Sequence, residues 1–246
     1  MGISVPHKLF FAGISILGIL MSASAQPKNI LISDYNSPEE VSICINPKKP
    51  NQVVAGANIE NYYFSSDSGK TWRNGRLKSS YGVWGDPCIV VDTLNNFYYF
   101  HLSYPENGNW IDRTVCQKST DGGLTWSNGT YSGLNGKKAQ DKHWAVVDRK
   151  TNNIYLTWTQ FDKYGSSNPN DSTIILFSKS IDAGASWSLP VRINKKAGDC
   201  IDEDNTVEGA VPAVGPNGEV YVAWVGPGGI VFNKSLDMGN TWLNNE

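Results

Sequence analysis

SSDSGKTW at residues 65–72 returns three times along the chain, as STDGGLTW at 119–126, SIDAGASW at 180–187 and SLDMGNTW at 235–242. Ser, Asp, Gly, a hydroxyl residue and Trp keep fixed offsets in every copy, and successive copies begin 54, 61 and 55 residues apart. Self-similarity at such a period predicts an array of small units that bury their apolar faces by stacking on one another. We call the four eight-residue copies the boxes. They decide the fold class before any other feature of the chain.

Each position of the box has a structural interpretation. The Asp carboxylate is expected to accept hydrogen bonds from backbone amides two residues further on, and the Gly suits a position with positive φ. The Trp offers a large apolar surface that can wedge between neighbouring sheets. A catalytic role for the box aspartates would need four copies of an acid where one site needs one or two. We therefore interpret the four box aspartates as turn-forming residues: Asp67, Asp121, Asp182 and Asp237.

The segments between the boxes repeat in a fixed order. Short runs of β-branched and aromatic residues, bounded by Asn, Gly, Asp and Pro, are typical of strands. The first strand of each unit is expected at 41–46, 87–92, 144–148 and 210–215, and the second at 52–58, 96–104, 153–161 and 219–225. A third strand leads into each box, and a polar fourth strand leaves it. Four antiparallel strands in a repeating unit predict the blades of an all-β propeller.

The box pattern resembles the Asp-box, or bacterial neuraminidase repeat, of sialidase-type β-propellers. That resemblance implies six blades, so the four blades present are expected to be part of a larger propeller in one domain, residues 26–246. A closed four-bladed ring and assembly with another chain are the alternatives. The segment at 28–34, KNILISD, is a lone strand candidate, which in a closed ring would supply the outer strand of the last blade.

The first 25 residues have the features of a secretory signal peptide: one lysine, an apolar run at 9–20 and Ala23-Ser24-Ala25 before Gln26. We therefore expect the protein to be secreted, periplasmic or on the cell surface. The remaining 221 residues carry 20 basic and 23 acidic side chains. Without a basic face or an amphipathic helix, neither nucleic acid nor a membrane is an expected partner.

Four cysteines are compatible with an oxidising compartment but do not define a pairing. Cys44 and Cys88 lie in apolar runs, and we favour buried free thiols for both. Whether Cys116 and Cys200 are free or paired is left open. No Cys or His spacing typical of a metal site occurs, and no cofactor is expected. The acidic loop at 199–208 lacks the calcium-loop pattern, so it is interpreted as solvated.

Antiparallel topology places the loops that enter each first strand on the face opposite the box turns, around the central channel. Three acids stand at those entries in three different blades: Asp86, Asp141 and Glu208. They are the candidate catalytic residues, because glycoside hydrolysis commonly uses two carboxyl groups, one of them with a raised pKa. Lys142 and His143 adjoin Asp141 and are candidate substrate-binding residues.

Aromatic residues on the same face could stack on sugar rings, and Trp110 and Tyr164 are the candidates for substrate binding, with Trp84 and Trp144 beside them. An alternative interpretation explains the same acids without any ligand. An acid before each first strand would then cap loop amides, and His143 would be a packed residue.

Family resemblance implies three arginines that clamp a sugar carboxylate, the first of them in an Arg-Ile-Pro motif. That motif is absent, and none of the five arginines opens a first strand. Two hypotheses follow: a sialidase-like glycosidase or lyase acting on extracellular glycans, or a non-catalytic propeller that binds a glycan or glycoprotein at the same face.

Overall fold

The computed structural model describes residues 1–2, 28–201 and 203–243, so the expected signal peptide lies almost entirely outside the described residues. The compact unit that contains all the strands is Leu31–Glu246. All regular elements in the described residues are β-strands, as the sequence predicts. Within these residues no helix is long and apolar enough to span a membrane.

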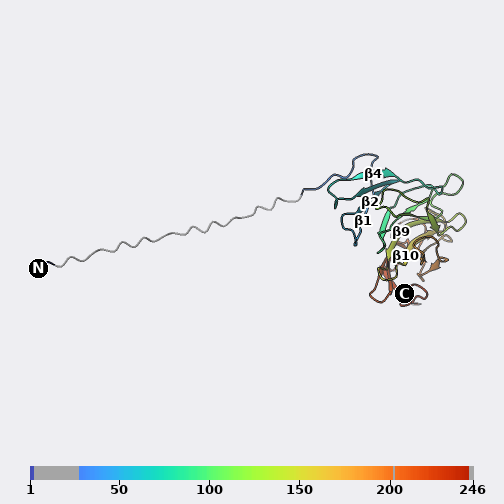
Figure 1. Ribbon diagram of the computed structural model, residues 1–246. Coiled ribbons are helices and arrows are strands. Elements are labelled where there is room, and N and C mark those ends of the chain that lie inside the picture. The colour runs from blue at the N-terminus through green and yellow to red at the C-terminus, as the bar shows by residue number, and fades with distance from the viewer. Residues whose placement is uncertain (3–27, 202, 244–246) are drawn as a thin grey trace. The chain divides into compact units, whose positions relative to one another are not determined.

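The strands form four antiparallel sheets, each built from consecutive segments of the chain (Figure 1). The first contains β1 (Ser42–Ile45), β2 (Val53–Ala57), β3 (Asn61–Ser65) and β4 (Arg73–Arg76). The second contains β5 (Cys88–Val91), β6 (Phe97–Leu102), β7 (Thr114–Ser119) and β8 (Thr130–Ser132). The third contains β9 (Ala139–Val147), β10 (Ile154–Phe161), β11 (Thr173–Ser180) and β12 (Val191–Arg192). Three described strands form the fourth: β13 (Glu208–Val214), β14 (Val220–Gly226) and β15 (Gly229–Ser235).

The first strand of each sheet packs beside the first strand of the next, so β1, β5, β9 and β13 form the inner row. Apolar side chains fill the space between consecutive sheets. Trp158 and Phe100 belong to one such core, and Trp224 and Tyr155 to the next. This stacking of four-stranded units confirms the predicted propeller architecture, while the number of blades in the whole protein stays a prediction.

Hydrogen bonds in the box turns follow one scheme in all four copies. In the first, Asp67 Oδ1 accepts from Thr71 N at 2.9 Å and Oδ2 from Thr71 Oγ1 at 2.7 Å. Ser65 Oγ donates to Asp67 Oδ1 and accepts from Gly69 N, where φ is +82°. The aspartate therefore closes the turn as expected, but it bonds the amide four residues on, where two had been predicted. These bonds, the one from the Thr71 amide foremost, lower the pKa of Asp67 to about 2.

The box tryptophans pack against the preceding sheet. The Trp126 ring lies 5.6 Å from that of Tyr99 and 5.9 Å from that of Tyr62, in edge-to-face contact. In the next two sheets Trp187 contacts Phe100 and Trp242 contacts Phe177 in the same manner. The predicted wedge between sheets is confirmed, although these indoles are half-buried and not fully enclosed.

Two details correct or complete the sequence predictions. Residues 28–34 form no strand, so the expected pairing of this segment with the last blade is not observed. All four cysteines are free thiols, with Cys88 buried as predicted and Cys44 only partly so. Cys116 and Cys200 are also buried.

Candidate functional site

The third and fourth inner strands begin earlier than the sequence predicts, and each contains a bulge. In β9, Asp141 pairs with Thr159 and Trp144 pairs with Thr157, so Lys142 and His143 together face one residue of β10. Asp141, Lys142 and His143 had been expected in a loop before the strand. Glu208 is likewise the first residue of β13, and its strand shifts register before Val211. Pairing with the second strand overrides the weak β-propensity of charged side chains here.

The same place in all four sheets carries a residue with positive φ. The angle is 47° at Glu40, 53° at Asp86, 44° at Lys142 and 67° at Gly209. Charged side chains rarely adopt this backbone region, and bulges near binding sites re-aim side chains. At three of these four positions the residue is charged: Glu40, Asp86 and Lys142. Its side chain therefore leaves the alternating in-and-out pattern of a strand near the start of an inner strand.

Those three side chains meet. Lys142 Nζ lies 3.5 Å from Asp86 Oδ2 and 4.0 Å from Glu40 Oε1, which joins blades one, two and three by charge. Burial opposes the lysine charge, but the carboxylates of Asp86, Asp141 and Glu40 outweigh it and raise the pKa of Lys142. The hydrogen bond to Asp86, together with desolvation, raises the pKa of Glu40. This ion cluster forms the centre of the candidate site.

Asn58 holds two members of the cluster in place. Its Nδ2 donates to Glu40 Oε2 at 2.6 Å, and its Oδ1 accepts from the backbone N of Asp86 at 2.7 Å. Gly85 must stay a glycine beside it, because a Cβ there would lie 2.3 Å from Asn58 Oδ1. Asn58 is thus a positioning residue that ties the entry of the second inner strand to that of the first.

We expect Asn58→Ala to destabilise the protein by about 1–3 kcal/mol, because it leaves the Asp86 amide without its acceptor. Chemical denaturation measures this directly. Asn51→Ala is the matched control: Asn51 makes one exposed bond to the Ser66 carbonyl, and its loss should cost well under 1 kcal/mol. Equal effects of the two substitutions would contradict the positioning role.

Asp141 lies behind the ion cluster, with only 6% of its surface exposed. Desolvation, reinforced by the Asp86 charge, raises the pKa of Asp141 to about 7, although Oδ1 accepts from the Lys142 amide at 2.8 Å. Glu208 contributes to the same field and is half-buried. The structure thus brings together in one electrostatic cluster the three predicted catalytic acids, Asp86, Asp141 and Glu208.

His143 is placed differently from its neighbour Lys142. Only 3% of its surface is exposed, and both ring nitrogens lack a hydrogen-bond partner. Burial lowers the pKa of His143 to about 4, so the ring is neutral at pH 7. It borders a small hollow of about 230 Å³ that Glu40, Asp86 and Lys142 also line.

A second hollow of about 510 Å³ adjoins this one and shares Glu40 and Asp86. Trp84 forms part of its wall, and Arg76 stands at its border in an ion pair with Glu60. We call the two hollows together the mouth. The predicted aromatic residues Trp110 and Tyr164 do not line it but lie next to Trp84, with Trp110 between the other two.

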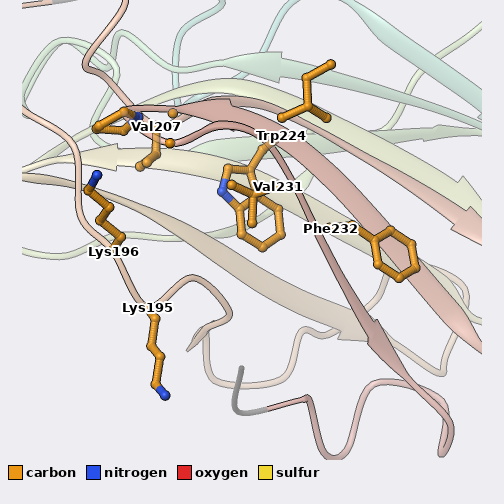
Figure 2. Close-up of a pocket in the computed structure, with 10 residues that line it drawn as sticks. Lys195, Lys196, Val207, Trp224, Val231 and Phe232 are labelled. Carbon is orange, nitrogen blue, oxygen red and sulfur yellow. The ribbon is translucent and has the colours of Figure 1, made fainter. Parts of the chain in front are cut away.

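A larger hollow of about 770 Å³ lies elsewhere, on β14 and β15. Figure 2 shows Trp224, Val231 and Phe232 grouped there, with the side chains of Lys195 and Lys196 apart from them. Among the residues that the structure describes, no acidic side chain lines this hollow, in contrast to the mouth.

Arginine clamps are not found at the mouth among the described residues. Arg113 is held by Asp112 at 2.7 Å and lies over the rings of Tyr81 and Tyr131. The others lie on outer strands or in a turn: Arg73 and Arg76 in β4, Arg149 after β9, and Arg192 in β12.

Sequence reasoning missed Glu40 and Asn58. Glu40 precedes the first inner strand just as Asp86 precedes the second, so the blade repeat itself carried the signal. Asn58 follows the second strand of its blade and had no distinguishing neighbour in the sequence.

Comparison with known proteins supports the fold alone. No family model matches the chain, and no curated protein matches it. A Dyadobacter fermentans protein of unknown function is similar in structure, with a TM-score of 0.60 and 16% identity over 84% of this chain and 67% of that one. The leech intramolecular trans-sialidase has a TM-score of 0.58 and 12% identity, and the match covers 90% of this chain and 53% of that one. A thermostable family-43 glycoside hydrolase has a TM-score of 0.56 and 14% identity, and the match covers 85% of this chain and 73% of that one.

The protein is therefore an all-β chain with the propeller fold that these carbohydrate-active enzymes share, and with an acidic mouth at the entries of its inner strands. It spans about half the length of the trans-sialidase.

Proposed function

We propose that this protein is a secreted glycan-processing propeller, a glycoside hydrolase of the sialidase-like type, with its reaction centre at the mouth. The observation that carries the proposal is the meeting of Glu40, Asp86 and Lys142 from three blades, together with the adjoining Asp141 carboxyl, whose pKa is raised. Structural neighbours that act on carbohydrates support it through their fold.

The residues divide into roles by their electrostatics. Asp141 is the proton donor, since a pKa of about 7 leaves it substantially protonated at neutral pH. Asp86 or Glu208 is the second carboxyl, which would act as base or nucleophile on the far side of the bond. Lys142 supplies a counter-charge to the carboxylates of Asp86 and Glu40, which offsets their mutual repulsion.

Charge at the mouth also bears on the substrate. Four acids and two basic residues line the mouth: Glu39, Glu40, Glu60 and Asp86 against Lys142 and Arg76. An anionic sugar would meet net repulsion there, whereas hydroxyl groups can donate to the carboxylates. We propose a neutral glycan, free or attached to protein, as the ligand.

Binding without chemistry is the second candidate, and one observation favours it. Asp141 is only 6% exposed, so proton transfer to a glycosidic oxygen needs neighbouring groups to move aside. A non-catalytic propeller would use the same residues to hold a glycan without that movement.

Turnover of a panel of nitrophenyl glycosides, neutral and sialylated, between pH 4 and 9 separates these functions. We expect hydrolysis of a neutral glycoside, with a rate that falls above about pH 7 as Asp141 loses its proton. Binding of neutral sugars without any turnover would support the second candidate. Preference for the sialylated substrate would overturn the charge argument.

A further inference from the structure

Four aromatic side chains lie in edge-to-face contact beside the mouth, and we call them the aromatic row: Trp84, Tyr104, Trp110 and Tyr164. Ring centroids are 5.2 Å apart between Trp84 and Tyr104, 6.2 Å between Trp84 and Trp110, and 5.2 Å between Trp110 and Tyr164. The residues come from three separate loops in two blades, so folding gathers them from distant parts of the sequence.

The row is exposed although its members are among the most apolar side chains. The exposed fractions are 36% for Trp84, 53% for Tyr104 and 38% for Trp110. By contrast, the aromatic rings of Tyr98, Tyr99 and Phe100 in β6 are fully buried. Contiguous exposed apolar surface with a polar border is typical of a ligand-binding site.

Position connects the row with the mouth. Trp84 lines the 510 Å³ hollow together with Glu40 and Asp86, so one end of the row is the wall of the candidate site. From there the row runs through Trp110 to Tyr164, where Phe161 packs behind it at 4.8 Å. Phe161 is completely buried and anchors that end to the core.

A glycan chain is the occupant that fits both parts. Sugar rings have apolar C–H faces that stack on aromatic rings, and their hydroxyl groups hydrogen-bond to carboxylates such as those at the mouth. A purely apolar partner would have no use for the adjoining acids. A single bound sugar would leave the row beyond Trp84 uncovered.

We propose that the aromatic row binds consecutive sugar units of a polysaccharide whose reacting unit lies in the mouth, so that the protein binds chains more tightly than single glycosides. This inference rests on the proposed function for the location of the reacting unit. Binding to the row itself does not require turnover.

Native gels containing arabinoxylan, galactomannan or mucin test the row on the folded protein. We expect at least one neutral polysaccharide to retard the wild-type protein. The double substitution Trp84→Ala with Trp110→Ala should weaken the apparent affinity about tenfold, the loss of roughly 1.4 kcal/mol of stacking. Phe232→Ala is the control, because Phe232 is 53% exposed but lies at the other hollow. Thermal melting checks that each variant is folded.

The outcomes separate the row from the reaction centre. Loss of retardation by the double variant, with its melting temperature unchanged, supports the row as a chain-binding surface. Retardation without any turnover in the wild type would refute the proposed enzyme but not the row. If no polysaccharide retards the wild type, or if the double variant is retarded equally, the inference is wrong. It is also wrong if the row instead joins two copies, which gel filtration of wild type and variant would reveal.

Discussion

Asp141→Asn is expected to lower the turnover of any glycoside that the protein hydrolyses by at least about a hundredfold. The amide keeps the acceptor for the Lys142 amide and the side-chain shape, but it cannot donate and recover a proton. A matched variant, Asp171→Asn, changes an acid in the loop after β10 that lies outside the mouth, and it should leave turnover unchanged. Steady-state kinetics on the nitrophenyl substrates measures both.

The same substitution, Asp141→Asn, should raise the stability of the folded protein although it lowers turnover. Because the pKa of Asp141 is raised in the folded state, the folded protein binds more protons than the unfolded chain between about pH 4 and pH 7. Ionised Asp141 therefore costs stability as the pH rises through that window, by on the order of a few kcal/mol. The neutral asparagine removes this cost, so the variant should melt above the wild type at pH 8 and near it at pH 4.

A gain in thermal stability together with a loss of turnover would identify an acid retained for function at the expense of folding. If the variant instead melts below the wild type at pH 8 while keeping full glycan affinity and turnover, Asp141 is a loop cap.

Trp126→Ala should have the largest effect on folding, a loss of about 3 kcal/mol. This is the lower end of the range for buried aromatic truncations, because the indole is half-buried. Its removal takes away the edge-to-face contacts with Tyr62 and Tyr99 and opens the core between the first two sheets. Urea denaturation of the variant measures the loss.

Trp110→Ala is the control for that experiment, since it deletes the same side chain from an exposed position. We expect it to cost less than about 1 kcal/mol. If the two substitutions cost the same, the box tryptophans do not hold neighbouring sheets together, and the structural interpretation of the repeats loses its main support.

Much of the fold could be predicted from the sequence because the boxes encode local chemistry. An aspartate that bonds a hydroxyl residue four positions on, and a glycine with positive φ, make the same turn wherever the motif occurs. The apolar runs of the second strands predict buried centres such as that of β10. Local rules were enough for these elements.

The site was less predictable because it depends on departures from those rules. Sequence placed Asp141 and Lys142 in a loop, whereas pairing with β10 draws them into a strand and the bulge re-aims the lysine. The partners of Lys142 are Glu40 and Asp86, 102 and 56 residues away in the sequence, and no local pattern specifies such contacts. The burial of His143 agrees with the alternative interpretation of the sequence, in which this residue is packed.

A crystal structure of the protein soaked with an oligosaccharide from whichever neutral polysaccharide binds it tests the central claim most directly. The account predicts sugar density at the mouth, within hydrogen-bond distance of Asp86, Glu40 or Lys142, and continuing over Trp84 toward Trp110. Density confined to the box turns, or to the hollow walled by Trp224 and Phe232, would contradict it.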